Sequence, residues 1–258
     1  MDNNRIVNRE FIVKENCYFD DLPFYYDHNQ IAHCTYCTRY FAGCFIDGTF
    51  RSPWDPCHDI KLVFTDGACS NNGQVNATSG MGIVMGTAPE YQWSIPIDDS
   101  VDPRALRTSQ RAELLAAIRG LEELEKEAQE SYSPSLRKHS DSLYPAMVLR
   151  GRSSWCVTDS HYVAEGITKW FPQWQVCEVM NAINRCSVLT SSTNENQRRN
   201  SWRTSQGVPP TNLDLFCRLD SIVTDLELIG LEVGFWKIGR EDNHEADALA
   251  KTAARISV

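Results

Sequence analysis

The segment IKLVFTDG, residues 60–67, constrains the fold of this chain most, because it places an acidic side chain on the apolar face of a strand. Ile60, Leu62 and Phe64 alternate with their neighbours at the period of a strand with one face better buried than the other. The same alternation puts Asp66 on the face of Leu62 and Phe64. A charge that faces a core costs several kcal/mol unless it is compensated, so Asp66 requires a partner.

Strand and helix patterns follow residue 59 in an order typical of an α/β domain. Three strands come first, and their close spacing predicts an antiparallel meander. The elements that we expect are strands at 60–66, 80–86 and 91–97, a helix over 109–127, a strand at 153–159, helices from about 160 and over 213–229, a strand at 231–238 and a helix over 243–255. This order predicts one mixed five-stranded sheet flanked by helices, and Ser109 is the candidate N-cap of the long helix.

Charge and hydropathy exclude several classes of protein. The 258 residues carry a formal net charge of −9, which argues against binding nucleic acid through overall basic charge. No run of eighteen apolar residues occurs, and charged residues occupy the N-terminal stretch where a secretory signal has its apolar segment. We expect an intracellular monomer without a membrane partner, with cytoplasm, nucleus and mitochondrion left open.

Four carboxylates hold special positions in the expected arrangement. Asp66 lies in the first strand, Glu113 in the first turn of the long helix, Asp159 at the end of a strand and Asp247 in the first turn of the last helix. Taken singly, each has a structural alternative, since the helix macrodipole favours acids at N-termini and an Asp-Gly pair is commonly a turn. If the four carboxylates cluster, they repel one another, and two divalent cations would bring the net charge of the cluster near zero. Oxygen ligands favour magnesium, with manganese as a substitute.

Five sequence blocks resemble type 1 ribonuclease H in that family's own order: FTDGAC, TSQRAELLAAIRGLEEL, VTDSHYVAEGITKWFPQW, SWRTSQGVPPTNLDLFCRLD and NHEADALAKTAA. The resemblance covers residues 59–258 and implies the ribonuclease H fold. It also implies two-metal-ion cleavage of the RNA strand of RNA–DNA hybrids, leaving a 3′-hydroxyl and a 5′-phosphate. By resemblance, the four metal-binding acids are Asp66, Glu113, Asp159 and Asp247. Asp66 would bridge both ions, Asp247 would complete the site that orients the attacking water, and the other two acids would complete the second site.

The resemblance implies further contacts with the RNA strand. Asn72 falls six residues after Asp66, where the family has a substrate-contacting asparagine. Ser109 and Gln110 stand where the family commonly has paired asparagines, and both keep the hydrogen-bonding capacity needed to read 2′-hydroxyls. The alternative for Asn72 is a turn residue in the SNNG loop.

A second substrate region corresponds to the family's basic protrusion, which grips the DNA strand. Trp170, Trp202 and Arg203 lie there, and aromatic faces combined with cations suit a phosphate and sugar surface. Core packing is the alternative for the tryptophans. The chain departs from the family in its loop before the last helix, which has no histidine before Asn243. Arg240 is the nearest cation that could take a similar electrostatic role in turnover.

Residues 1–58 do not resemble the hybrid-binding domain found ahead of many eukaryotic relatives, and we interpret them as a separate Cys-rich segment. The chain has ten cysteines, which in an intracellular protein favour buried thiols or metal ligands over disulfides. A structural zinc ion needs four sulfur or nitrogen ligands, for which Cys34, Cys37, Cys44 and Cys57 are candidates. Ordinary buried or surface thiols are the alternative.

The sequence therefore predicts a metal-dependent endoribonuclease that acts on RNA–DNA hybrids. An alternative is a catalytically silent ribonuclease H-like module that binds hybrid or double-stranded RNA, although acidic residues at all four positions count against it. A third possibility is the same fold acting on another substrate, such as double-stranded RNA.

Overall fold

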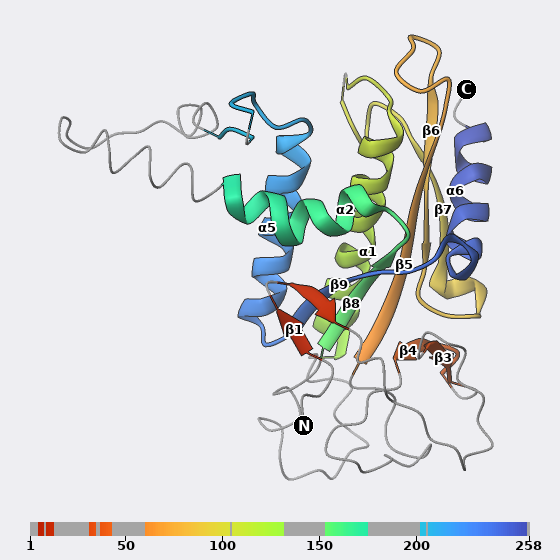
Figure 1. The fold of residues 1–258 in the computed structure, drawn as a ribbon. Coiled ribbons are helices and arrows are strands. Elements are labelled where there is room, and N and C mark those ends of the chain that lie inside the picture. Colours follow the sequence, from red (N-terminus) through yellow and green to blue (C-terminus); the bar gives the residue numbers. More distant parts are fainter. Residues whose placement is uncertain are drawn as a thin grey trace, which may run out of the picture.

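The structure is a computed structural model that describes residues 5–7, 9–12, 31–34, 37–42, 60–103, 105–131, 153–174, 202–204 and 206–256. Within these residues a mixed sheet has helices on both faces (Figure 1). No described helix is long and apolar enough to cross a membrane.

The predicted sheet is confirmed. Strands β5 (Ile60–Ser70), β6 (Thr78–Val84) and β7 (Gln92–Ile97) form an antiparallel meander. Strands β8 (Ser153–Thr158) and β9 (Glu232–Lys237) follow in parallel, β8 beside β5 and β9 beside β8. The parallel register of β5 and β8 aligns Phe64 with Val157, so Asp66 and Asp159, each two residues further on, lie beside one another.

The helices match the expected order with small differences at their ends. They are α1 (Ser109–Ser131), α2 (His161–Glu165), a π-helical segment (Gly166–Trp170), α5 (Leu213–Leu228) and α6 (His244–Ile256). The prediction that Ser109 caps the long helix was wrong, because Thr108 Oγ1 accepts the hydrogen bond from Arg111 N at 3.2 Å. Helix α1 also continues four residues past the predicted end at Glu127.

Two hydrophobic cores lie on opposite faces of the sheet. Val63 and Ile83 pack with α1 and α5 on one face, while Leu62, Phe64 and Ala246 pack together on the face covered by α6. The expectation that β5 has one better-buried face was therefore wrong: all side chains from 62 to 66 are buried, since helices cover both sides.

Four short strands from the N-terminal segment extend the sheet beyond the five that we expected: β1 (Arg5–Val7), β2 (Glu10–Ile12), β3 (Ile31–His33) and β4 (Tyr40–Ala42). The β1–β2 hairpin pairs in parallel with β9, and the β3–β4 hairpin pairs antiparallel with β5. These strands lie at the lower end of the sheet in Figure 1. The boundary at residue 58 stays a prediction, but the described parts of residues 1–58 are joined to the sheet rather than separate from it.

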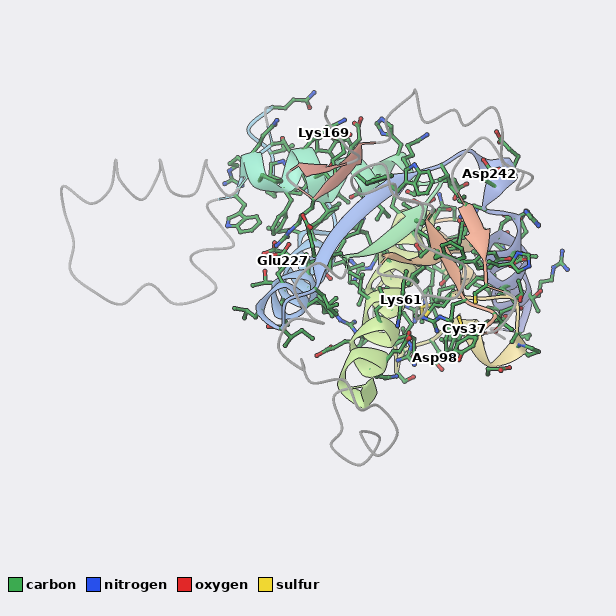
Figure 2. The ribbon with its side chains drawn as sticks, turned by 90° about the horizontal axis from the view of Figure 1, so that it is seen from below. Cys37, Lys61, Asp98, Lys169, Glu227 and Asp242 are labelled. Atoms are coloured by element: carbon green, nitrogen blue, oxygen red, sulfur yellow. The ribbon has the colours of Figure 1, made fainter. Side chains whose placement is uncertain are left out.

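Side-chain contacts anchor both hairpins. Arg9, which has a left-handed φ of 64°, donates to Glu227 and Asp220 of α5, and Phe11 meets Trp236 of β9 edge to face with ring centroids 5.3 Å apart. At the other hairpin, Arg39, which directly precedes β4, forms an ion pair with Glu127 of α1. Lys61 of β5 pairs with the same carboxylate. Figure 2 shows this end of the molecule from below, with Lys61 and Cys37 labelled.

Candidate active site

Glycines bring the first turns of two helices close to Asp66. A Cβ at Gly67 would lie 2.1 Å from the backbone nitrogen of Glu113, so only glycine allows α1 to approach β5 at this point. Gly82, the partner of Asp66 across the β5–β6 pair, serves α6 in the same way: its Cβ would lie 2.1 Å from the carbonyl oxygen of the residue before Asp247. Acids from α1, β5 and α6 are thereby gathered at one end of the sheet.

Asp66 experiences the other three carboxylates most directly. Its side chain is 8% exposed, and burial raises its pKa to about 7, with further upward contributions from the charges of Asp159, Asp247 and Glu113. The pKa of Glu113 is raised as well, first by burial and then by the charge of Asp159. Buried like charges that destabilise one another form a site that favours a cation.

Hydrogen-bond donors hold two of these acids in place. Ser160 caps α2 by accepting from Val163 N, and its hydroxyl donates to Glu113. The amide nitrogen of Asn243 donates to Asp159 Oδ1 at 2.9 Å and to the carbonyl of Thr65 at 3.1 Å. Asn243 is 1% exposed, so its side chain is set by these bonds and by packing.

Two cations flank Asp247. Lys251 Nζ lies 2.7 Å from Asp247 Oδ2, one helical turn along α6. The Arg240 guanidinium lies 3.8 Å from Asp159 Oδ2 and 3.9 Å from Asp247 Oδ1, and its side chain is 76% exposed. Arg240 thus stands at the solvent side of the acidic cluster.

The four carboxylates fit a divalent cation by their chemistry. In the part of the chain that the structure describes, no three His, Cys, Asp or Glu side chains are already drawn together around one metal position. The oxygens of Glu113, Asp159 and Asp247 are instead held by Ser160, by Asn243 and by the two flanking cations. An all-oxygen set with mutual repulsion matches hard cations such as Mg²⁺, which retain several waters rather than requiring a complete protein cage.

Two of the residues proposed to contact the RNA strand are hydrogen-bonded to one another. Asn72 Oδ1 accepts a hydrogen bond from Ser109 N at 3.0 Å, which ties the β5–β6 turn to the start of α1. Asn72 is exposed, and so is Gln110. The predicted contact residues are therefore neighbours, and Asn72 also has the turn role given as its alternative.

The predicted protrusion residues divide into surface and core. Trp170 is half-buried, with its ring 5.7 Å from that of Tyr162, and Arg203 is exposed. Trp202 is only 8% exposed and packs edge to face on Phe171, with ring centroids 5.0 Å apart. The prediction that Trp202 contacts substrate is therefore corrected: its indole fills the core, the alternative weighed for it.

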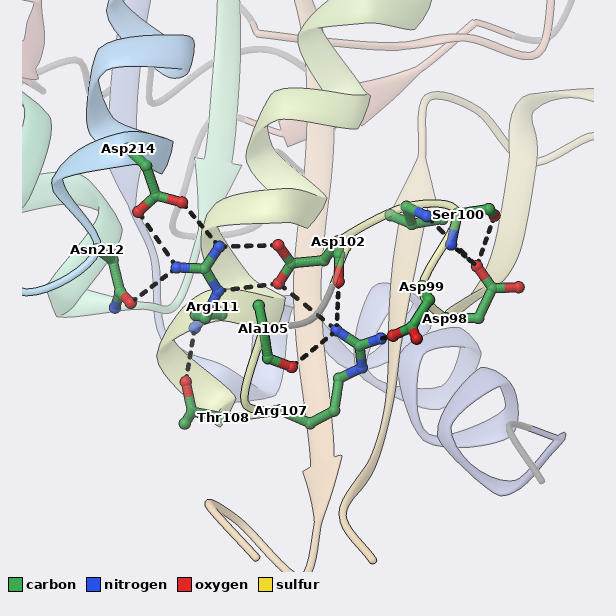
Figure 3. A network of polar contacts seen from close by, with 11 residues as sticks. Asp98, Asp99, Ser100, Asp102, Ala105, Arg107, Thr108, Arg111, Asn212 and Asp214 are labelled. Carbon is green, nitrogen blue, oxygen red and sulfur yellow. Dashed lines mark hydrogen bonds and ion pairs between the residues drawn. The ribbon is translucent and has the colours of Figure 1, made fainter. Parts of the chain in front are cut away.

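A polar network that the sequence did not reveal holds the first turn of α1 against the loop before it and the start of α5 (Figure 3). Arg111 donates to both oxygens of Asp102, each at 2.8 Å, to both oxygens of Asp214, and to Asn212. Asp102 is 6% exposed and Asn212 has a left-handed φ of 57°. Arg111 follows Ser109 and Gln110 directly, so the network anchors the helix turn that presents them.

Half of the predicted zinc ligands lie outside the described residues, namely Cys44 and Cys57. Cys34 and Cys37 belong to the tight turn between β3 and β4, where Cys37 N donates to Cys34 Sγ at 3.5 Å. Thr38 completes this turn with a left-handed φ of 60°.

Sequence reasoning missed Ser160, Asn243 and Arg111. Ser160 and Asn243 each directly precede a helix, so their position indicates a capping role. Their bonds to Glu113 and Asp159 join segments far apart in the chain, and a local pattern carries no signal for such contacts.

Comparison with known proteins identifies relatives over the part of the chain that contains the four acids. The RNase H family model matches residues 58–255. "Ribonuclease H1" of Mus musculus is 26% identical over 76% of this chain and 50% of its own length, so the chain spans about half the length of this relative. "Ribonuclease H" of Nitrosococcus oceani is 28% identical over 76% of this chain and 94% of its own length. Among solved structures, LC11-RNase H1 in complex with RNA/DNA hybrid has a TM-score of 0.41 and 18% identity, covering 75% of this chain and 96% of that one.

Proposed function

The chain belongs to the RNase H family, and from that premise we propose that it is an endoribonuclease that cleaves the RNA strand of RNA–DNA hybrids. The observation that carries the proposal is the convergence of Glu113, Asp159 and Asp247 on Asp66. Burial, followed by these three charges, raises the pKa of Asp66 to about 7. Curated relatives named ribonuclease H support the activity.

The proposed cofactor is a pair of Mg²⁺ ions, with Mn²⁺ as a substitute. When bound, two divalent cations promote the in-line attack of water at phosphorus and stabilise the leaving oxygen, which yields a 3′-hydroxyl and a 5′-phosphate. Asp66 is the central ligand in this proposal, because it interacts electrostatically with each of the other three acids. Glu113, Asp159 and Asp247 complete the set.

The other polar residues position these groups and the substrate. Ser160 and Asn243 orient the carboxylates of Glu113 and Asp159. Arg240 supplies positive charge on the exposed side of the cluster, where an anionic phosphate would approach. For the RNA strand we propose contacts from Asn72, Ser109 and Gln110, and for the other strand from Trp170 and Arg203.

A comparison of labelled RNA–DNA hybrid, double-stranded RNA and double-stranded DNA tests the proposal directly. With Mg²⁺ we expect cleavage of the RNA strand of the hybrid, with 5′-phosphate ends on the products, and none with EDTA. Cleavage of double-stranded RNA alone would favour the altered-substrate alternative. Binding of hybrid without cleavage would favour the silent module.

Acid-to-amide variants test the site. Asp66→Asn, Glu113→Gln, Asp159→Asn and Asp247→Asn should each lower kcat by at least about a hundredfold, since neutral amides are poor ligands for hard cations. The control is Asp225→Asn, which removes an exposed acid from α5 and should leave cleavage unchanged. A folded variant that retains more than about a tenth of wild-type activity would remove its residue from the proposed site.

A further inference from the structure

Tyr40 of the N-terminal segment lies between two elements that carry proposed metal-binding acids. Strand β4 continues the sheet beside β5 at the point where β6 ends: Phe41 pairs with Lys61, and Tyr40 N donates to the carbonyl of Met85 at 3.0 Å. An aromatic side chain from outside the family's matched residues is thereby inserted into the face of the sheet covered by α6.

The ring and the hydroxyl of Tyr40 contact different partners. The ring meets Phe64 of β5 edge to face, with centroids 5.1 Å apart, and packs against the buried cluster that includes Phe64 and Ala246 of α6. The hydroxyl lies 3.1 Å from both carboxylate oxygens of Glu245 and donates to them. Phe64 stands two residues before Asp66.

The bond between Tyr40 and Glu245 restrains the first turn of α6. Burial, followed by the charge of Glu245, raises the pKa of Tyr40 to about 12, so the hydroxyl remains a donor throughout the neutral range. Glu245 lies two residues before Asp247, and residues two apart on a helix point in different directions. The contact can therefore hold the turn without occupying the Asp247 carboxylate.

We propose that Tyr40 is a positioning residue for the metal site: by binding Glu245 and packing on Phe64, it fixes the separation between the α6 turn that carries Asp247 and the strand that carries Asp66. The proposal rests on the proposed function, because it assigns those two acids to one divalent-cation site. It gives the N-terminal segment a role in catalysis although none of the four acids lies within it.

The first experiment uses Tyr40→Phe in the full chain, which keeps the ring and removes the donor. Two quantities are measured as Mg²⁺ is titrated: the rate of hybrid cleavage, and the melting temperature in the absence of nucleic acid. We expect the Mg²⁺ concentration at the midpoint of both titrations to rise about fivefold or more, the size of change expected from the loss of one hydrogen bond. The KM for hybrid should stay unchanged.

A matched control separates positioning from general stability. Glu127→Gln weakens the same β3–β4 hairpin at Arg39 and Lys61, on the α1 side of the sheet, and leaves the Tyr40–Glu245 bond intact. It should lower the melting temperature of the metal-free protein without moving the Mg²⁺ midpoint. Glu245→Gln should reproduce the Tyr40→Phe effect, and the double variant should be no worse than either single one, because both remove the same contact.

Several outcomes would overturn the proposal. A Tyr40→Phe protein with the wild-type Mg²⁺ midpoint would do so, as would an equal shift in Glu127→Gln or fully additive effects in the double variant. If Tyr40→Phe fails to fold, Glu245→Gln alone decides by the same midpoint. A wild-type protein that cuts no hybrid would instead contradict the proposed function, while the thermal titration would still report on Tyr40 and the metal site.

Discussion

At Asp66, burial and three neighbouring negative charges act in the same direction on one carboxyl group. Its pKa in the folded protein is about 7, compared with 3.8 for an unperturbed aspartate. Between these values the folded state holds a proton that the unfolded chain has released. The metal-free protein therefore loses stability as the pH rises from about 4 to about 7, because the ionised form is disfavoured by the fold.

We predict that Asp66→Asn stabilises the metal-free protein at pH 8 by a few kcal/mol and has little effect at pH 4, where the wild-type carboxyl is protonated in the folded state. Thermal melting in EDTA across this pH range measures the difference. Excess Mg²⁺ should restore most of the stability that the wild-type protein loses at pH 8, since a cation favours the ionised carboxylate. Equal melting curves for both proteins at pH 8 would contradict the raised pKa.

Arg240 offers a second test at the residue scale. Its guanidinium lies beside Asp159 and Asp247 but is largely exposed, so it can serve the reaction without supporting the fold. We predict that Arg240→Ala lowers kcat about tenfold or more at saturating Mg²⁺, within the range of one electrostatic contact in an active site, while the KM for hybrid changes little. Steady-state kinetics check this, with Arg255→Ala at the far end of α6 as the control; a raised KM with unchanged kcat would reassign Arg240 to binding.

The four acids could be proposed from sequence because each stands in a recognisable block: Asp66 lies inside a strand, Asp159 directly follows one, and Glu113 and Asp247 lie near the N-termini of helices. Their partners could not. Ser160, Asn243 and Tyr40 acquire their roles only when distant segments meet, and Trp202 in the core has the same residue type as a tryptophan on a binding surface. Residue type and spacing identify side chains capable of the chemistry, whereas their burial and their contacts can be known only from the folded structure.

At the scale of elements, the five main strands and the long helices follow from periodicity, because each is long enough to display it. The N-terminal strands contain three residues each and show no period. They are strands because β9 and β5 offer open backbone edges, a tertiary cause that local propensity does not encode.

The approach of α6 to the sheet gives a prediction at this scale. Gly82→Ala should push α6 away from β6 because the added Cβ would overlap the backbone at Ala246, at a cost of about 1–3 kcal/mol or more. We expect a lower melting temperature together with a loss of hybrid cleavage greater than the unfolded fraction explains. The control is Gly230→Ala, where a left-handed φ of 87° after α5 makes the substitution costly far from the acids. It should reduce stability and leave kcat unchanged, and the same result for Gly82→Ala would contradict the packing argument.

For the whole molecule, the N-terminal segment is attached at two places, with β2 on β9 and β4 on β5. Five of the ten cysteines of the chain lie in residues 1–58. We predict that a zinc ion held by Cys34, Cys37, Cys44 and Cys57 stabilises this segment. Cys34 and Cys37 already lie close together, since Cys37 N donates to Cys34 Sγ.

Elemental analysis of protein purified without chelators should then find about one zinc per chain, a level that accords with the four-ligand stoichiometry of structural sites. Cys34→Ser should release the metal and lower the melting temperature. Cys217→Ser, which alters a half-buried thiol on α5, should do neither. Zinc-free protein with a wild-type melting temperature would show that the thiols act as small apolar side chains instead.

The pairing of β2 with β9 also bears on how the protein is made. Glu10 is aligned with Phe235, so residues 5–12 leave the ribosome long before the strand with which they pair. Until β9 is synthesised, this hairpin has no strand with which to pair. The sheet therefore cannot be completed before β9 is synthesised, and until then the nascent protein exposes unpaired backbone that can bind chaperones or aggregate.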